Sequence, residues 1–119
     1  MPLQTDEEAL ACARRGAALL DLVEPGWDLG INPVNVRLHD YCGCVMAHYG
    51  GGANPTMSKG LARLRERCTG LGLDISLSHQ FGFSVDAGLD NPSLAYWYAP
   101  LQRAWDTIFA ERRAAREAS

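Results

Sequence analysis

Residues 5–23, TDEEALACARRGAALLDLV, carry the clearest structural signal in the chain. Thr5 stands three residues before Glu8, which is the arrangement of an N-terminal capping box. Apolar residues then recur at helical spacing; they are Leu10, Ala13, Ala17 and Leu20. Pro25-Gly26 follows and ends the pattern. We therefore predict a helix over residues 6–23, and its many small side chains allow a second helix to approach closely.

Two shorter helices are predicted in the middle of the chain. Asp40 is a suitable N-cap for a helix that runs to about residue 49, where the glycines at 50–52 end it. Asn54-Pro55-Thr56 opens a further helix over roughly residues 56–69. The apolar residues of that second helix recur at helical spacing, so we expect them to be buried; they are Leu61, Leu64 and Cys68.

The last helix is predicted to begin at Asn91-Pro92, because Asn is favoured at the N-cap and Pro at the first helical position. A broad apolar stripe follows, made of Leu94, Trp97, Leu101, Trp105, Ile108 and Phe109. Pro100 interrupts this stripe, so either the helix kinks there or a new helix begins near it. The last turns are basic, which suits the negative end of the helix dipole; the residues are Arg112, Arg113 and Arg116.

Two segments alternate apolar and polar residues, the period expected of a strand. The first contains Val34, Val36 and Leu38, and the second contains Leu73, Ile75 and Leu77. They are candidates to pair with one another. The predicted fold class is therefore mainly α, a compact bundle of three to four helices, with a short two-stranded accessory. A length of 119 residues fits a single globular domain over residues 1–119.

The net charge and the distribution of apolar residues indicate which classes of partner and which cellular location to expect. The net charge of -3 repels nucleic acid at long range, so a nucleic-acid partner is not expected. No apolar run approaches the ~18 residues of a membrane span, so no membrane partner is expected either. The first residues are acidic and polar, unlike a secretory signal. We expect a cytoplasmic location, where the four cysteines are reduced.

Residues 39–52, HDYCGCVMAHYGGG, hold two of the four cysteines and two of the three histidines. Four of these side chains offer the nitrogen and sulfur ligands that zinc takes in tetrahedral geometry; they are His39, Cys42, Cys44 and His48. Their spacing matches none of the common zinc motifs. Cysteines also serve as small buried apolar residues. We therefore predict no metal site and no cofactor, with zinc on these four residues as the alternative.

Catalysis by a cysteine requires a base within hydrogen-bond reach of the thiol. The histidines that could serve are His39, His48 and His79. No signature of a known cysteine enzyme surrounds any of the four cysteines. The glycines at 50–52 lack the pattern of a phosphate-binding loop. We therefore predict no catalytic residue and no enzymatic activity.

Two groups of side chains are candidates for an interaction surface. Lys59, Arg63 and Arg67 are spaced i, i+4, i+8 and share one face of a predicted helix. Tyr96, Trp97 and Tyr98 are consecutive, so they cannot all face one core. We expect Trp97 to point inward, with Tyr96 or Tyr98 exposed or facing a second copy of the chain. The predicted interaction residues are Tyr96, Tyr98, Lys59, Arg63 and Arg67.

Several short motifs together resemble a small protein family of actinobacterial phages that has no assigned function. They are Ala13-Arg14-Arg15-Gly16-Ala17-Ala18-Leu19-Leu20-Asp21, Pro25-Gly26-Trp27, Cys44-Val45, Tyr49-Gly50, Leu71-Gly72-Leu73, Gly82-Phe83, and Tyr98…Leu101…Trp105…Ile108…Arg112-Arg113. The resemblance spans most of the chain and implies a phage or prophage origin. Relatives have Cys-x-x-Cys directly before the valine, whereas here Tyr41 occupies the first of those positions.

The resulting hypothesis is a small phage or prophage accessory protein in the cytoplasm of the infected or lysogenic host cell. It acts by protein–protein interaction, either self-association or binding of a host factor, and it performs no catalysis. The alternative is a zinc-stabilised regulatory or DNA-binding module. Aromatic side chains are enriched at binding hot spots, which favours the first hypothesis.

Overall fold

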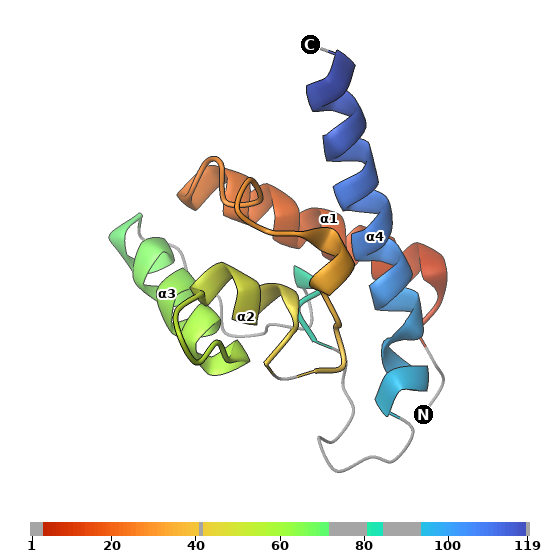
Figure 1. The fold of residues 1–119 in the computed structure, drawn as a ribbon, viewed down its shortest axis with the longest axis horizontal. Coiled ribbons are helices and arrows are strands. Elements are labelled where there is room, and N and C mark those ends of the chain that lie inside the picture. The colour runs from red at the N-terminus through yellow and green to blue at the C-terminus, as the bar shows by residue number, and fades with distance from the viewer. Residues whose placement is uncertain (1–3, 41, 72–80, 85–93, 119) are drawn as a thin grey trace.

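Helices make up the ordered elements of the computed structural model, which describes residues 4–40, 42–71, 81–84 and 94–118; no strand occurs in these ranges. The α-helices are α1 (Asp6–Val23), α2 (Val45–Gly50), α3 (Met57–Gly70) and α4 (Leu94–Ala118), and a 3-10 turn, η1, covers Pro33–Asn35. α1 packs against α4, α2 packs against α3, and α1 also contacts α3 (Figure 1). The predicted mainly α class is confirmed. None of the described helices is long and apolar enough to cross a membrane.

α1 has the predicted bounds and the predicted capping box. The Glu8 N–H donates to Thr5 Oγ1 at 3.1 Å, and the Thr5 N–H donates to the Glu8 carboxylate at 3.3 Å. The buried face of α1 consists mainly of small residues, namely Ala9, Ala13, Gly16, Ala17 and Leu20. A Cβ on Gly16 would lie 2.0 Å from the carbonyl oxygen of Phe81. The glycine therefore allows the 81–84 segment to lie directly on the helix.

The core is centred on Trp105, which is fully buried. Its ring lies 6.2 Å from Trp27, 6.0 Å from Phe83 and 5.9 Å from Phe109, measured between ring centroids. The indole N–H donates to the carbonyl oxygen of Gly82 at 2.6 Å. Buried Trp needs such a partner, and the aromatic pairs add stabilisation beyond area burial. One side chain thus joins α4, the 24–32 loop and the 81–84 segment.

α2 begins later than predicted, because Asp40 caps a turn and not the helix. The Asp40 carboxylate accepts a hydrogen bond from the Cys42 N–H at 2.9 Å, and the backbone carbonyl oxygen of Asp40 accepts one from the Gly43 N–H at 3.0 Å. Asp side chains commonly satisfy a local turn in this way. The N-cap of α2 is Cys44, which makes no side-chain capping bond.

The predicted strand over Val34, Val36 and Leu38 is wrong. Pro33 begins the η1 turn instead. The backbone groups that a second strand would pair are bound by Gln102 of α4, which donates to the Val36 carbonyl at 3.1 Å and accepts from the Leu38 N–H at 2.8 Å. The alternation of buried and exposed residues holds only in part, since Val36 and Leu38 are buried but Val34 is exposed. The second predicted strand lies in residues 72–80, outside the described ranges.

α3 and α4 largely follow their predictions. Thr56 caps α3, accepting a bond from the Lys59 N–H at 3.3 Å, and the helix continues to Gly70. Leu64 and Cys68 are buried, and Leu61 is half-buried. α4 runs through Pro100 as one helix, so no new helix begins there. The predicted start at Asn91-Pro92 lies outside the described ranges.

α2 and α3 contact each other through glycine. A Cβ on Gly60 would lie 1.8 Å from the carbonyl oxygen of Met46, and a Cβ on Gly50 would lie 2.7 Å from the backbone nitrogen of Gly60. Backbone atoms cannot rotate away as a side chain can. The close packing of α2 against α3 therefore requires glycine at both positions.

We predict that Gly60→Ala lowers the free energy of unfolding by about 2 kcal/mol, as overpacking of a tight site does. Gly70→Ala is the matched control, because nothing lies within 4 Å of its Cβ position. It should be neutral or stabilising by about 0.5 kcal/mol through helix propensity. Urea denaturation measures both, and equal effects of the two substitutions would contradict the contact.

Candidate interaction surface

The exposed side of α4 forms a shallow groove with the η1 turn, which lies beside the middle of the helix (Figure 1). Two adjoining hollows of about 540 and 360 Å³ make up this groove. The buried Tyr98 and Phe109 form part of its floor, and we define the α4 face as the remaining helix residues that line it: Ala95, Ala99, Gln102, Arg103, Asp106, Ala110, Arg113, Ala114 and Glu117. At 3.6 residues per turn they lie about 60° to 180° around the helix from Trp105, with Gln102 nearest the buried side and Ala114 directly opposite.

Val34 is the most exposed large apolar side chain of the described residues, at 72%. It lines both hollows together with Pro33. Its backbone is firmly held: the Asn32 side chain accepts its N–H at 3.2 Å, and the Arg37 guanidinium donates to its carbonyl at 2.8 Å. Val34 is thus an exposed apolar side chain on a held turn at the edge of the α4 face.

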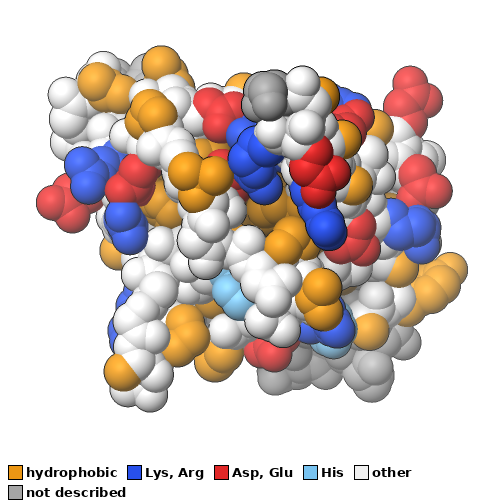
Figure 2. Space-filling view, turned by 45° about the horizontal axis from the view of Figure 1, so that its top comes forward, with side chains coloured by type: hydrophobic (Ala, Val, Ile, Leu, Met, Phe, Trp, Pro, Cys, Tyr) orange, Lys and Arg blue, Asp and Glu red, His pale blue; other side chains and the backbone are white. Residues whose placement is uncertain are grey.

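Charges of both signs occupy the α4 face. Arg103 pairs with Asp6 at 2.8 Å, and Arg113 pairs with Glu117 at 3.2 Å. Asp106 accepts a hydrogen bond from Gln102 at 3.1 Å. Figure 2 shows acidic and basic side chains interspersed over the side of the molecule in view. Exposed pairs of this kind contribute about 0–1 kcal/mol each, so the side chains are available for contacts with another molecule.

The inner side of α4 is fixed to the rest of the fold by a cluster around Trp27. Arg112 donates to both carboxylate oxygens of Asp21, at 2.8 and 2.6 Å, and its guanidinium carbon lies 5.5 Å from the Trp27 ring centroid. The Trp27 indole N–H donates to Asp21 at 3.0 Å. Arg116 donates to the buried Asp28 at 2.9 Å. These contacts hold the C-terminal half of α4 in place.

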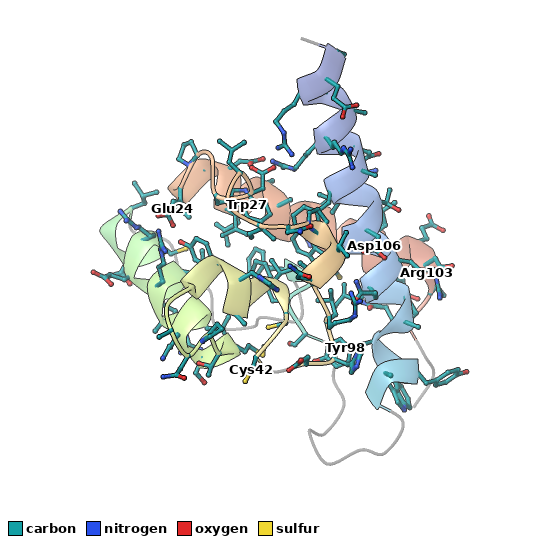
Figure 3. All side chains as sticks on the ribbon, in the orientation of Figure 1. Glu24, Trp27, Cys42, Tyr98, Arg103 and Asp106 are labelled. Atoms are coloured by element: carbon teal, nitrogen blue, oxygen red, sulfur yellow. The ribbon has the colours of Figure 1, made fainter. Side chains whose placement is uncertain are left out.

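The three consecutive aromatics follow the prediction in part: a tyrosine points outward as expected, but Trp97 is not the residue that points inward. Tyr98 is buried, with 6% exposed, and Trp97 is half-buried. Tyr98 shares the buried side with Leu101 and Trp105, at i+3 and i+7, so the tyrosine takes the place expected for Trp97. Tyr96 points outward and is 65% exposed. Figure 3 shows Tyr98 on the inner side of α4 and Arg103 on the outer side.

The predicted basic face of α3 is engaged within the molecule. Lys59 donates to the Asn54 carbonyl at 2.6 Å. Arg63 pairs with Glu24 and donates to the Tyr49 carbonyl at 3.1 Å, and Arg67 lies 3.4 Å from Glu24. Burial, followed by the nearby Glu24 charge, raises the pKa of Tyr49 above its usual value. Glu24 could not be recognised from a local pattern, because it is 39 residues away from Arg63 in the chain.

The four residues of the zinc alternative are not gathered in one place. Cys44 is buried, and its burial raises the pKa of the thiol. Cys42 and His39 are exposed, and His48 Nε2 lies 3.1 Å from the Asn35 carbonyl oxygen. Within the described ranges, no group of three or more His, Cys, Asp or Glu is arranged to hold a metal ion. His79, the remaining histidine, lies outside these ranges.

No family model matches the chain, and no curated protein or solved structure matches it. The surface must therefore be interpreted from its own geometry. The sequence analysis did not single out Val34 or the charged residues of the α4 face as candidates for an interaction surface. A signal was present, because Arg103, Asp106, Arg113 and Glu117 all fall on the side of the helix opposite its apolar stripe.

We predict that Asp21→Asn destabilises the protein at neutral pH but has little effect in acid. The hydrogen bonds from Arg112 lower the pKa of Asp21 below its ordinary 3.8, against the opposing effect of burial. A lowered folded-state pKa gives stability that is full above about pH 4 and is lost as the pH falls through the folded pKa. Urea denaturation of both proteins at pH 7 and pH 2 measures the difference, and a difference independent of pH would refute the claim.

We also predict that the thiols react with an aromatic disulfide in an order set by exposure. Cys42 should react first, and Cys44 and Cys68 only after unfolding, because both are buried and burial raises the pKa of both thiols. Cys42→Ser should remove the fast phase. Added zinc should leave the rate unchanged. Protection of Cys42 by equimolar zinc would instead support the zinc alternative.

Proposed function

We propose that this protein is a binding module that acts through protein–protein contact at the α4 face and the adjoining Val34, and that it performs no catalysis. The observation that carries the proposal is the exposure of Val34 on a held turn beside the groove. The resemblance to actinobacterial phage proteins supports a role as a small phage or prophage accessory protein. On this proposal it works in the cytoplasm of the infected or lysogenic host cell.

The shape of the surface supports a protein partner. Exposed apolar residues bordered by polar ones are typical of protein interaction sites. Alanines line much of the α4 face, and small residues let a partner helix approach to about 8 Å between axes. Charged side chains surround this centre, as they do at the rim of protein interfaces.

The charges favour a protein over a nucleic acid. A nucleic-acid surface concentrates basic residues on one side. Here Arg103 and Arg113 alternate with Asp106 and Glu117. Glu24, which follows the end of α1, partly neutralises the basic residues of α3 that the DNA-binding alternative would use. The α4 face therefore suits a partner that itself carries both signs of charge.

We predict that Val34→Asp weakens binding to a protein partner by about tenfold or more, because it places a charge against the apolar surface that Val34 covers at the edge of the contact. Leu29→Asp is the matched control. Leu29 is 68% exposed in the loop before η1 and does not line the groove. Neither change should lower the melting temperature appreciably, since both side chains are already exposed.

Binding would be followed by light scattering of the purified protein and by affinity capture from host cells. Loss of binding in Val34→Asp with retention in Leu29→Asp would support the proposal. Equal binding by both variants would contradict it. So would a wild-type chain that neither self-associates nor captures any protein.

A further inference from the structure

We propose that the partner is a second copy of this chain, and that the two α4 helices pack antiparallel about a two-fold axis at Ala110. This inference rests on the proposed function and names its partner. It follows from the order of positive and negative charges along the α4 face, because this order is complementary to the same order read in the opposite direction. The match involves Arg103, Asp106, Arg113 and Glu117.

The charges are placed almost symmetrically about Ala110. Arg103 lies seven residues before it and Glu117 seven residues after it. Asp106 lies four residues before it and Arg113 three residues after it. When two such helices run in opposite directions, Arg103 therefore faces Glu117 of the second copy, and Arg113 faces position 107, directly beside Asp106 of the second copy. A two-fold interface of this kind is self-complementary by construction.

The opposite arrangement is disfavoured. Two parallel helices in register would place Arg103 against Arg103 and Glu117 against Glu117. Like charges held together across an interface are repulsive, and they are one way in which proteins exclude wrong pairings. The pattern therefore selects both the direction of the second helix and its register.

Packing at the centre of the contact is also suitable. Ala110 is exposed and small, and Ala114 lies one turn further along the same side. Residues 103–117 span about 21 Å of helix, at about 1.5 Å per residue. Each copy brings its own Val34 to the edge of the contact, where it can cover apolar surface of the other helix. The C-terminal end of α4 extends beyond the other helices (Figure 1), so it is open to a second chain.

The ion pairs within the isolated chain can be replaced by ion pairs between two chains. Arg103 and Asp6 have side chains that are 59% and 70% exposed, and Arg113 and Glu117 are 77% and 67% exposed. Pairs exposed to this extent contribute little to stability, so replacing them by pairs across the interface costs little. By contrast, Arg112 and Arg116 hold the inner side of α4 and remain in place.

The test uses two charge reversals, Arg103→Glu and Glu117→Arg. Each variant alone should raise the dimer dissociation constant about tenfold or more, because both copies then place like charges opposite one another. Mixing the two variants should restore dimers, since every facing pair in the heterodimer is again of opposite sign. The double variant should also recover dimerisation. Sedimentation equilibrium measures all four samples.

The recovery cannot arise within a single chain. Positions 103 and 117 of one chain are about 21 Å apart on the helix, so their charges cannot compensate within a single molecule. Arg65→Glu, on the exposed side of α3, makes the same change in net charge as Arg103→Glu and should leave dimerisation unchanged. If it weakened dimerisation equally, net charge and not facing pairs would be the cause, and the proposal would be wrong.

Failure of this inference is distinguishable from failure of the proposed function. A wild-type chain that remains monomeric, yet captures another protein in a manner that Val34→Asp abolishes, overturns the dimer and leaves the function standing. Dimers that form but are unaffected by the charge reversals overturn the antiparallel α4 contact. A mixture of the two variants that stays monomeric overturns it as well.

Discussion

The hydrogen bond from the Trp105 indole to the Gly82 carbonyl is the contact on which the rest of the structure depends. It is formed inside a cluster of aromatic rings, where an unpaired N–H or carbonyl would be costly. Because Gly16 lets the 81–84 segment lie on α1, this one bond joins α4 to α1 through that segment. The side of α4 that carries Trp105 is therefore buried in the core, and the opposite side of the helix must face outward.

The position of the proposed interaction surface follows from this constraint. Gln102 stands at the border of the two sides of α4 and binds the backbone of Val36 and Leu38. That contact holds the loop against the helix and sets the position of η1. Val34 is consequently exposed beside the α4 face, although its neighbour Val36 is buried. Gln102 thus connects the packing of the core with the exposure of Val34.

Local signals in the sequence were reliable where a helix is determined by its own residues. The capping box of α1, the Thr56 cap of α3 and the apolar stripe around Trp105 needed no knowledge of distant partners. The prediction that Asp40 caps α2 was wrong because the same side chain satisfies a turn equally well. The strand at Val34 was wrong because its backbone is paired by Gln102, which is more than 60 residues away. Long-range pairs such as Arg63 with Glu24 leave no local pattern, and for this reason the basic face looked free.

The central claim is that the outward side of α4 is the surface on which another chain docks, and that this chain is a second copy. Amide chemical shifts recorded over a dilution series test it most directly, because they report each residue separately. We predict that the concentration-dependent shifts fall on residues 103–117 and on Val34, and that amides around Gly60 in α3 stay constant. Spectra that do not change with concentration, or that change chiefly in α3, would contradict the claim.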